Sequence, residues 1–431
     1  DFIWGVSGIG VRNCEPENHD ENRISDSILF LDDDVKKQDG DSFSFYEKAY
    51  KKYREELELM KSMGIANFRF SFSWSMIVPD KKGVVNPDVV AFYHRILDAC
   101  CEFGIEPFVT LSNCDLPSGI ELNGGWANRE ILDWFTDYVT FCAIEFKGKA
   151  KYWIILEEPS GLMGVGCFLG ASKSGKKKMS DFLPGLHHLL LCQAIGYRKI
   201  KEIAPDVLVG TIYSCTQVVP LSMDKKDLLA SKRIDALLNR LFIEPTLGFG
   251  YPTDILPFLT GVEKYILEGD YKLLPVAFDF IGLQNNGREV AVHSSFVPYL
   301  NAKLISGIKK TQNSKPINRE AYSESLYQMV KKFSNYQNVE KIIVEERRMV
   351  FKEAHDKSEL DYLKSVLEQL LETKQNGGKV AGYFIGSLNQ NLDGTGLQNQ
   401  HFGQVSVNVD FPKTYMKNSA HWYRKFLLGI D

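Results

Sequence analysis

The run YWIILEEP occupies residues 152 to 159, where five apolar or aromatic residues are followed by two glutamates and a proline. A short, continuously apolar run is typical of a parallel strand, because such strands are covered on both faces. The run therefore predicts one buried strand of an α/β protein, with Glu157 and Glu158 at the carboxyl end of that strand.

Seven further runs of this kind are separated by longer segments with helical spacing. They are FIWGV (2–6), NFRFSF (67–72), PFVTL (107–111), VLVGTIY (207–213), FDFIGL (278–283), KIIVE (341–345) and VAGYFIG (380–386). In the first long helical segment, apolar residues from Tyr46 to Met60 form one stripe, and Gly64 follows where a glycine commonly ends a helix. Further helices are expected at 86–103, 128–147, 181–204, 357–374 and 415–428.

Eight strands alternating with helices in 431 residues favour a single (β/α)8 TIM barrel over two doubly wound domains. No repeat, linker or shift in composition marks a boundary, so one domain is predicted over 1–431, with long loops near 13–43, 160–180 and 285–335. In such a barrel the loops that follow the strands build the site. Glu158 follows the fourth strand and Glu345 ends the seventh, so both are expected at the same mouth.

The composition argues against several classes of partner. The formal net charge is −4, from 51 basic and 55 acidic residues, which gives no broad attraction to nucleic acid or acidic lipid. The start DFIWGVSG lacks the pattern of a signal peptide, and no 18-residue apolar stretch could span a membrane. The eight cysteines form no CxxC pair and lie mostly in apolar runs, which indicates buried thiols in a reducing compartment. We predict a cytoplasmic protein without nucleic-acid or membrane partners, and the oligomeric state stays open.

No metal or cofactor is predicted. His187 and His188 begin an apolar helical segment, but no local spacing supplies the carboxylate or cysteine partners of a metal site. The segment SGKKKMS at 174–180 lacks the glycine spacing and the preceding strand of a phosphate-binding loop. The histidines are interpreted as a pair on a helix face, and the lysine-rich segment as a solvated loop.

The glutamates at strand ends four and seven suit the cleavage of a glycoside. One carboxylic acid protonates the departing oxygen while a carboxylate attacks or stabilises the anomeric carbon, and in retaining enzymes the two groups lie roughly 5 Å apart. Strand ends four and seven face each other across a barrel mouth, where Glu158 and Glu345 are expected. Glutamates at strand ends are common in any barrel, so a structural role for both is the alternative.

A series of motifs follows the predicted strands along the whole chain. In order they are FIWGVSG, NFRFSFSWSMIVP, GVVNPDVVAFYHRILDAC, GIEPFVTLSNCDLP, NGGW, WIILEEP, DFIGL, KIIVEE, GYFIGSL and SAHWYRKFL. This series resembles glycoside hydrolase family 1, the β-glucosidase family. The resemblance implies a (β/α)8 barrel and a retaining mechanism, with Glu158 as the acid/base, Glu345 as the nucleophile and Arg69 holding the nucleophile ionised. A small-molecule glycoside is the implied ligand.

The residues that this family uses to hold the sugar are mostly replaced in this sequence. Arg12 stands for a glutamine, Asn113 and Cys114 stand for the histidine and tryptophan of HWDLP, and Glu157 stands for the asparagine of NEP. The remaining replacements are Gln284, Asn285 and Asn286 for NYY, Glu346 and Arg347 after the nucleophile, and Gly386, Asp393 and Gly394 on the eighth strand and its loop. We predict a divergent member whose substrate-binding residues are Arg12, Asn113, Glu157, Gln284 and Asp393.

These replacements leave two hypotheses of different classes. The loss of tryptophans removes stacking surface, and the loss of polar groups removes discrimination between hydroxyls, so an ordinary β-glucoside would be held poorly. The first hypothesis is a retaining β-glycosidase with altered specificity, in which an arginine such as Arg12 would suit an anionic or phosphorylated ligand. The second is a catalytically inactive, glycosidase-like pseudoenzyme that binds a ligand or another protein. The presence of Glu158, Glu345 and Arg69 favours catalysis, whereas the loss of nearly every sugar-binding group favours the non-catalytic role.

The position of Glu157 leaves a further question. A second carboxylate beside the acid could repel Glu345, or it could draw Arg12 or Arg347 into a salt bridge. Adjacent strand residues point to opposite faces, so one member of each glutamate doublet could instead face away from the pocket.

Overall fold

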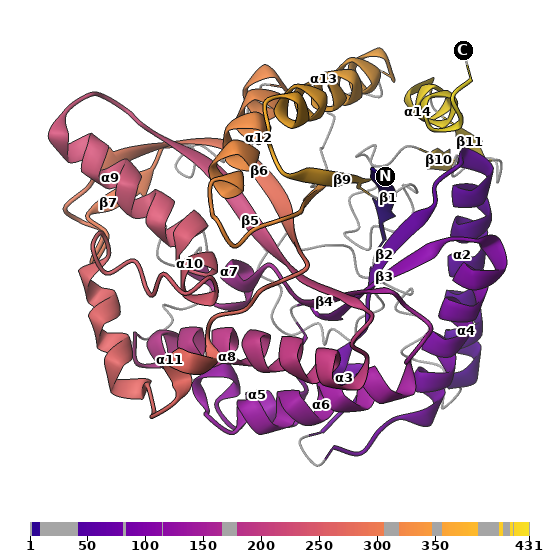
Figure 1. The fold of residues 1–431 in the computed structure, drawn as a ribbon, viewed down its shortest axis with the longest axis horizontal. Coiled ribbons are helices and arrows are strands. Elements are labelled where there is room, and N and C mark those ends of the chain that lie inside the picture. Colours follow the sequence, from indigo (N-terminus) through magenta and orange to yellow (C-terminus); the bar gives the residue numbers. More distant parts are fainter. Residues whose placement is uncertain are drawn as a thin grey trace.

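The computed structural model describes residues 2–8, 42–80, 83–113, 115–165, 179–305, 319–346, 356–386, 405–407, 414–416 and 418–430. Eight parallel strands pair in the order β1-β2-β3-β4-β5-β6-β8-β9, and β9 pairs with β1, which closes the barrel (Figure 1). Their bounds are β1 Ile3–Ser7, β2 Asn67–Ser71, β3 Glu106–Ser112, β4 Tyr152–Glu157, β5 Leu208–Pro220, β6 Phe280–His293, β8 Ile342–Glu345 and β9 Val380–Ile385. The predicted (β/α)8 barrel is confirmed.

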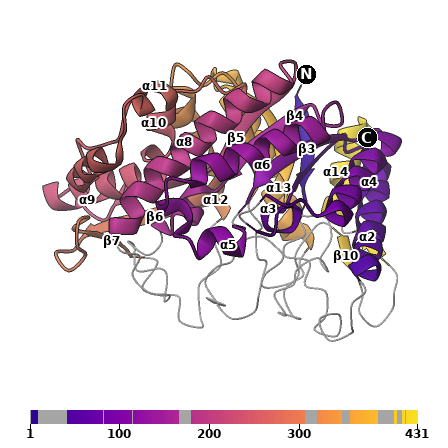
Figure 2. The same ribbon diagram turned by 90° about the horizontal axis from the view of Figure 1, so that it is seen from below.

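Helices cover the outside of this barrel. The long ones are α2 Ser42–Met63, α4 Pro87–Phe103, α6 Ile131–Glu145, α8 Met179–Ile203, α12 Arg319–Ser334, α13 Asp356–Gln375 and α14 Asn418–Leu428. The ends of α4 follow directly from the sequence, because the Asn86 side chain accepts hydrogen bonds from the first turn and Gly104 stops the helix with a φ of 70°. Figure 2 shows α6 and α8 side by side on the outer surface.

Side chains alternate along each strand between the helices and the inside of the barrel. On β2, Phe68 and Phe70 point outward and meet Tyr53 of α2. The inside holds a separate apolar layer made of Phe108, Ile154, Ile212, Phe280, Ile343 and Phe384. Glycines make room for its rings: a Cβ on Gly5 would lie 2.5 Å from the Phe384 ring. Further along β3, β5, β6 and β8, inward positions carry the polar residues Thr110, Ser214, Gln284 and Glu345, which form a polar layer above the apolar one.

The expected loop at 285–335 is wrong. Strand β6 continues to His293, β7 (Ala302–Leu304) pairs antiparallel with it, and α12 follows at Arg319–Ser334. Beyond the barrel rim, β5 and β6 stay paired from Gln217 and Arg288 to Pro220 and Ala291. Helix α9 (Lys225–Asp235) packs on this extension, at the left of Figure 1. The polar run QNNGRE (284–289) did not indicate a strand, because the strand pairing there continues outside the apolar interior of the barrel.

The other predicted boundaries differ less. Helix α14 begins at Asn418 rather than 415, because β11 (Thr414–Met416) pairs there with β10 (Val405–Val407). The predicted loops at 13–43 and 160–180 lie mostly outside the described residues. Cys100, Cys142, Cys192 and Cys215 are buried free thiols as expected, whereas Cys101 is exposed. Burial raises the pKa of the Cys100 thiol to about 12, which suits a packing role. None of the described helices has the length and apolarity needed to cross a bilayer.

Candidate active site

The polar layer brings together side chains from the carboxyl ends of five barrel strands. Ser7 ends β1, Arg69 lies on β2, Glu157 ends β4, Gln284 lies on β6 and Glu345 ends β8. None of the five exposes more than a tenth of its surface, and Glu157 exposes none. Strand ends far apart in the sequence therefore meet at one buried polar centre, as the barrel predicts.

A closed ring of four side chains forms this centre. The Arg69 guanidinium donates from Nη1 to Glu157 Oε2 at 2.7 Å and pairs through Nε with Glu345 Oε1. On the opposite side, Gln284 Nε2 donates to Glu157 Oε1 and to Glu345 Oε2, both at 2.8 Å. Each carboxylate thus has one oxygen on the guanidinium and the other on the amide. We call these four residues the carboxylate ring.

Two neighbours reinforce the carboxylate ring. Asn113 Nδ2 donates to Glu157 Oε2 at 2.7 Å, and the Ser7 hydroxyl donates to Glu345 Oε1 at 3.1 Å. Glu157 therefore accepts from Arg69, Gln284 and Asn113, which matches the acceptor-only character of an ionised carboxylate. Charge-assisted bonds of this kind are about twice as strong as neutral ones, and they offset the cost of burying the charge.

The carboxylate ring is not electrically balanced when both glutamates are ionised. Counted over the described residues, it then holds one guanidinium and two carboxylates, which is one negative charge in surplus in a water-excluded place. The same amide nitrogen, Gln284 Nε2, lies 2.8 Å from an oxygen of each carboxylate. The distance between these two oxygens therefore cannot exceed the sum of the two hydrogen-bond lengths. Like charges this close interact strongly where water is excluded.

Glu158 reaches the same end of the barrel through a local distortion. The register between β4 and β5 shifts between Ile154 and Glu157, and Glu158 adopts the left-handed conformation with φ 50° and ψ 58°. Such a conformation costs on the order of 1–3 kcal/mol for a non-glycine residue and is concentrated at functional sites. The Ser214 hydroxyl on β5 donates to Glu158 Oε1 at 2.7 Å, and Pro159 begins the short helix α7 (Pro159–Leu162).

The two glutamate doublets behave differently. Both Glu157 and Glu158 are buried and bonded to inward-facing residues of other strands, so neither faces away. In the second doublet Glu346 does face away, because its carboxylate accepts from the hydroxyl of Tyr383, which packs in the outer core. Among the described residues, Arg69 is the cation that contacts Glu157. Arg12, Cys114, Arg347 and Asp393 lie outside the described residues, so the predictions for them stay predictions.

Sequence reasoning missed several hydroxyl groups at this site. Ser7 and Ser214 contact Glu345 and Glu158, and each follows the apolar interior by the period of two that marks inward positions. Thr110, Ser112 and Ser71 lie on the inner face of β2 and β3 by the same period. Within the part of the chain that the structure describes, their buried hydroxyl oxygens have no hydrogen-bond partner, nor has Asn113 Oδ1. Buried polar atoms left in this way usually mark a place where a ligand or water bonds.

The residues near α8 give no sign of a metal ligand set. His187 bonds the Tyr251 hydroxyl and Asp270, both at 2.8 Å, and His188 bonds the carbonyl of Trp126 at 2.9 Å. Among the described residues, no group of three histidine, cysteine or acidic side chains is arranged to hold a metal. Both histidines are thus engaged in contacts within the protein.

Comparisons with known proteins agree with this fold. The family model described as Glycosyl hydrolase family 1 matches residues 1–428. β-Glucosidase A of Thermotoga maritima is 29% identical over 98% of this chain and 96% of its own length. β-Glucosidase 42 of Arabidopsis thaliana is 31% identical (89% and 84%), and a 6-phospho-β-galactosidase of Clostridium acetobutylicum is 26% identical (87% and 86%).

A solved structure extends this similarity to three dimensions. The family 1 β-glucosidase from Thermotoga maritima, in complex with isofagomine lactam, matches with a TM-score of 0.78 and 26% identity. The match covers 99% of this chain and 97% of that one. Together with the family model, it shows that the chain belongs to glycosyl hydrolase family 1.

Proposed function

We propose that this chain hydrolyses a β-glycosidic bond by the retaining mechanism, with Glu345 as the nucleophile. The carboxylate ring carries this proposal, because it holds both oxygens of Glu345 in place. A retaining enzyme needs an ionised carboxylate aimed at the anomeric carbon. Arg69 places an opposite charge at Glu345 Oε1, while Ser7 and Gln284 fix the orientation of this carboxylate. Relatives named β-glucosidase support the same reaction class.

Glu158 is proposed as the general acid/base. Its left-handed backbone lifts the carboxyl group out of the strand, and one oxygen is held by Ser214. Strain retained at a buried carboxyl group is hard to explain by packing alone, since another conformation would relieve it. In the first step Glu158 gives its proton to the departing oxygen. In the second step it takes a proton from the water that releases the sugar.

We further propose that the substrate is not the ordinary β-glucoside. Asn113, Glu157 and Gln284 shape the sugar subsite, together with Arg12 and Asp393, and the unpartnered hydroxyls on β2 and β3 add hydrogen-bonding capacity. Because Glu157 is fully buried, it acts on the subsite through Arg69, Gln284 and Asn113. The relatives include proteins named 6-phospho-β-galactosidase, so phosphorylated glycosides belong among the candidates.

One observation favours a second function, a glycosidase-like protein without catalysis. Among the described residues, Arg69 is the one arginine that contacts Glu345, and it also contacts Glu157. Glu345 itself exposes 2% of its surface. A carboxylate that is buried from solvent and shares its arginine with a second carboxylate would serve as part of a structural ion-pair network. In that case the barrel mouth binds a ligand without cleaving it.

Trapping with activated 2-deoxy-2-fluoroglycosides separates the two functions. The panel contains glucosyl, galactosyl, mannosyl, fucosyl and 6-phosphoglycosyl donors, and adducts are read by intact mass and peptide mapping. The variant Glu345→Gln should show no labelling, because it lacks the proposed nucleophile. Glu346→Gln is the matched control: its carboxylate lies one residue away and bonds Tyr383, so labelling should persist. Absence of any adduct and of any aryl-glycoside turnover across the panel would favour the non-catalytic function.

A further inference from the structure

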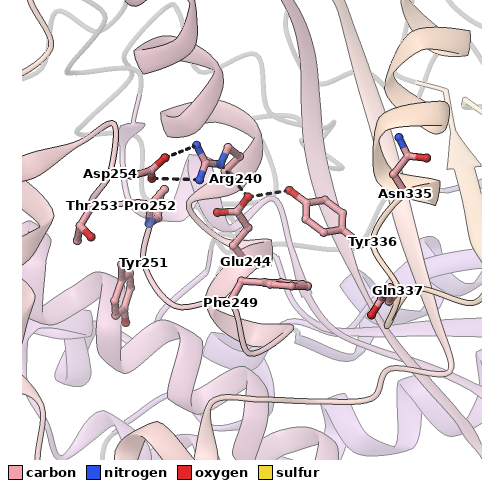
Figure 3. Close-up of a pocket in the computed structure, with 10 residues that line it drawn as sticks. All are labelled: Arg240, Glu244, Phe249, Tyr251, Pro252, Thr253, Asp254, Asn335, Tyr336 and Gln337. Atoms are coloured by element: carbon pink, nitrogen blue, oxygen red, sulfur yellow. Dashed lines mark hydrogen bonds and ion pairs between the residues drawn. The ribbon is translucent and has the colours of Figure 1, made fainter.

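A cavity of about 630 Å³ is lined by ten residues, none of which belongs to the carboxylate ring (Figure 3). Its walls include Arg240 and Glu244 on one side and residues 335–337 on the other. Residues 335–337 connect α12 to β8, which places this wall at the amino ends of the barrel strands. Glu158 and Glu345 lie at the carboxyl ends, so this cavity is distinct from the candidate active site.

Phe249 is presented to this cavity by a rigid turn. It lies between Gly248 and Gly250, whose φ values of 89° and 77° belong to the left-handed region that glycine favours. Its N–H donates to the Glu244 carbonyl at 2.9 Å, yet 57% of its surface is exposed. An aromatic side chain held in the open by a fixed backbone offers a ready contact face.

Tyr336 forms the second aromatic wall. Its ring lies 5.8 Å from that of Phe249, at an angle of 46°, so the two rings make a corner. Its hydroxyl donates to Glu244 Oε1 at 3.0 Å, and the same oxygen accepts from Arg240 Nε at 2.7 Å. Figure 3 shows Tyr336 pointing toward Glu244 in the centre of the cavity and Phe249 below it.

The charges of the lining residues restrict the ligand. Arg240 is engaged by Glu244 and by both oxygens of Asp254, so the described lining holds one cation and two anions. A phosphate or carboxylate ligand would meet surplus negative charge. Thr253, Asn335 and Gln337 add exposed hydroxyl and amide groups, which can both donate and accept. Aromatic faces beside such groups suit a molecule with an apolar C–H face and a rim of hydroxyls.

We propose that this cavity is a non-catalytic site for a neutral sugar, with a pyranose ring stacked on Phe249 in the corner that Tyr336 closes. The volume lies within the range of small-molecule sites and accommodates one or two sugar rings. Ring hydroxyls bond to Asp254, Asn335 and Gln337. The site is independent of the cleavage reaction, because it shares no residue with the carboxylate ring.

Saturation-transfer NMR titrations with cellobiose, lactose and maltose test this site. Phe249→Ala should weaken binding of at least one disaccharide about tenfold, as expected when one aromatic contact face is lost. Phe249→Tyr should restore binding because it keeps the ring. Phe296→Ala removes another exposed phenylalanine, 97% exposed and outside the cavity, and should leave binding unchanged.

Two outcomes overturn the proposal. One is that a disaccharide binds the wild-type protein and Phe249→Ala with the same affinity, or that no disaccharide binds either protein. The other is binding of tetramethylammonium, rather than any sugar, that depends on Phe249, which would assign the cavity to a cation. Both are independent of trapping at Glu345, because Phe249 lies outside the carboxylate ring and 57% of its surface is exposed.

Discussion

Two buried clusters in this protein combine an arginine with carboxylates, and they differ in their balance of charge. In the first, Arg129 holds Asp270 through two bonds of 2.8 and 2.7 Å, and His187 and the Leu267 N–H complete the set. In the carboxylate ring, Arg69 serves Glu157 and Glu345 at once. One guanidinium meets one carboxylate in the first cluster and two in the second.

The two clusters differ as a structural ion pair differs from the proposed reactive centre. Burial acts to raise the pKa of Asp270, but the hydrogen bonds from Arg129 and His187 outweigh it and hold that pKa well below its usual range. All of the charge of Arg129 is thereby used to keep one carboxylate ionised. In the carboxylate ring, Arg69 is the one cation among the described residues that contacts the two carboxylates. In the proposed reaction, these carboxylates lie where a cationic transition state forms.

The largest effect is expected from Arg69→Met. This change removes the one cation that the described residues supply to two buried carboxylates, and breaking such a pair costs about 3–5 kcal/mol. Urea denaturation should show this loss of stability, and labelling of Glu345 should disappear. Arg69→Lys keeps the charge and should recover part of the stability. Unchanged stability in Arg69→Met would mean that the ring is not held by its charges.

Asp270→Asn should destabilise by about 2–4 kcal/mol, somewhat less than Arg69→Met. It also breaks a buried pair, but the Arg129 side chain keeps 33% of its surface exposed, so water partly solvates the abandoned cation. Labelling of the folded protein at Glu345 should keep its wild-type rate. A large fall in that rate would contradict the assignment of this cluster to structure alone.

Glu157→Gln sharpens the role of the surplus charge. The amide has a single oxygen and cannot accept from both Arg69 and Gln284 in their present positions, so one donor loses its partner, and a negative charge that shares Arg69 and Gln284 with Glu345 is removed. We expect a loss of about 1–2 kcal/mol in stability and a fall of about tenfold or more in the trapping rate. Gln193→Glu makes the opposite exchange at a buried position outside the ring and is the control for altered charge. A faster trapping rate in Glu157→Gln would show that Glu157 restrains Glu345.

The smallest effect is the pH dependence of stability that arises from His188, the neighbour of His187 in the Arg129–Asp270 cluster. Burial lowers the pKa of His188 to about 4, below the value of about 6.5 for the unfolded chain. The unfolded state therefore binds more protons between these values, so stability is complete above pH 6.5 and falls as the pH drops toward 4. The loss should be about 1–2 kcal/mol, and His188→Gln should remove it. Urea denaturation across this pH window measures the loss. If the wild-type protein and His188→Gln lost the same stability, the loss could not be assigned to His188.

Much of this fold could be predicted because parallel strands buried on both faces leave simple apolar runs. All eight barrel strands were identifiable in this way. The extension of β5 and β6 was not, since its side chains alternate outside the apolar interior and Gln284 to Glu289 read as polar. Helix α12 was missed because its buried stripe, from Leu326 to Phe333, is interrupted by charged residues.

The candidate site was predictable residue by residue but not as an arrangement. Strand ends placed Arg69, Gln284 and Glu345 at one mouth. The simple alternation of a strand predicts that Glu157 and Glu158 point apart, and only the register shift in β4 and the left-handed Glu158 bring both inside. Backbone distortions of this kind have no composition signal here, because neither residue is glycine. The sharing of Arg69 followed from that distortion and was visible only in the structure.

The central claim is that Glu345 attacks the sugar from within the carboxylate ring. Incubation of the wild-type protein with the 2-deoxy-2-fluoroglycoside panel, followed by peptide mapping, tests it most directly. We predict a single adduct, on Glu345, from at least one donor, and none in Glu345→Gln. An adduct on Glu157 or any other residue, or no adduct and no turnover with every donor, would contradict the claim.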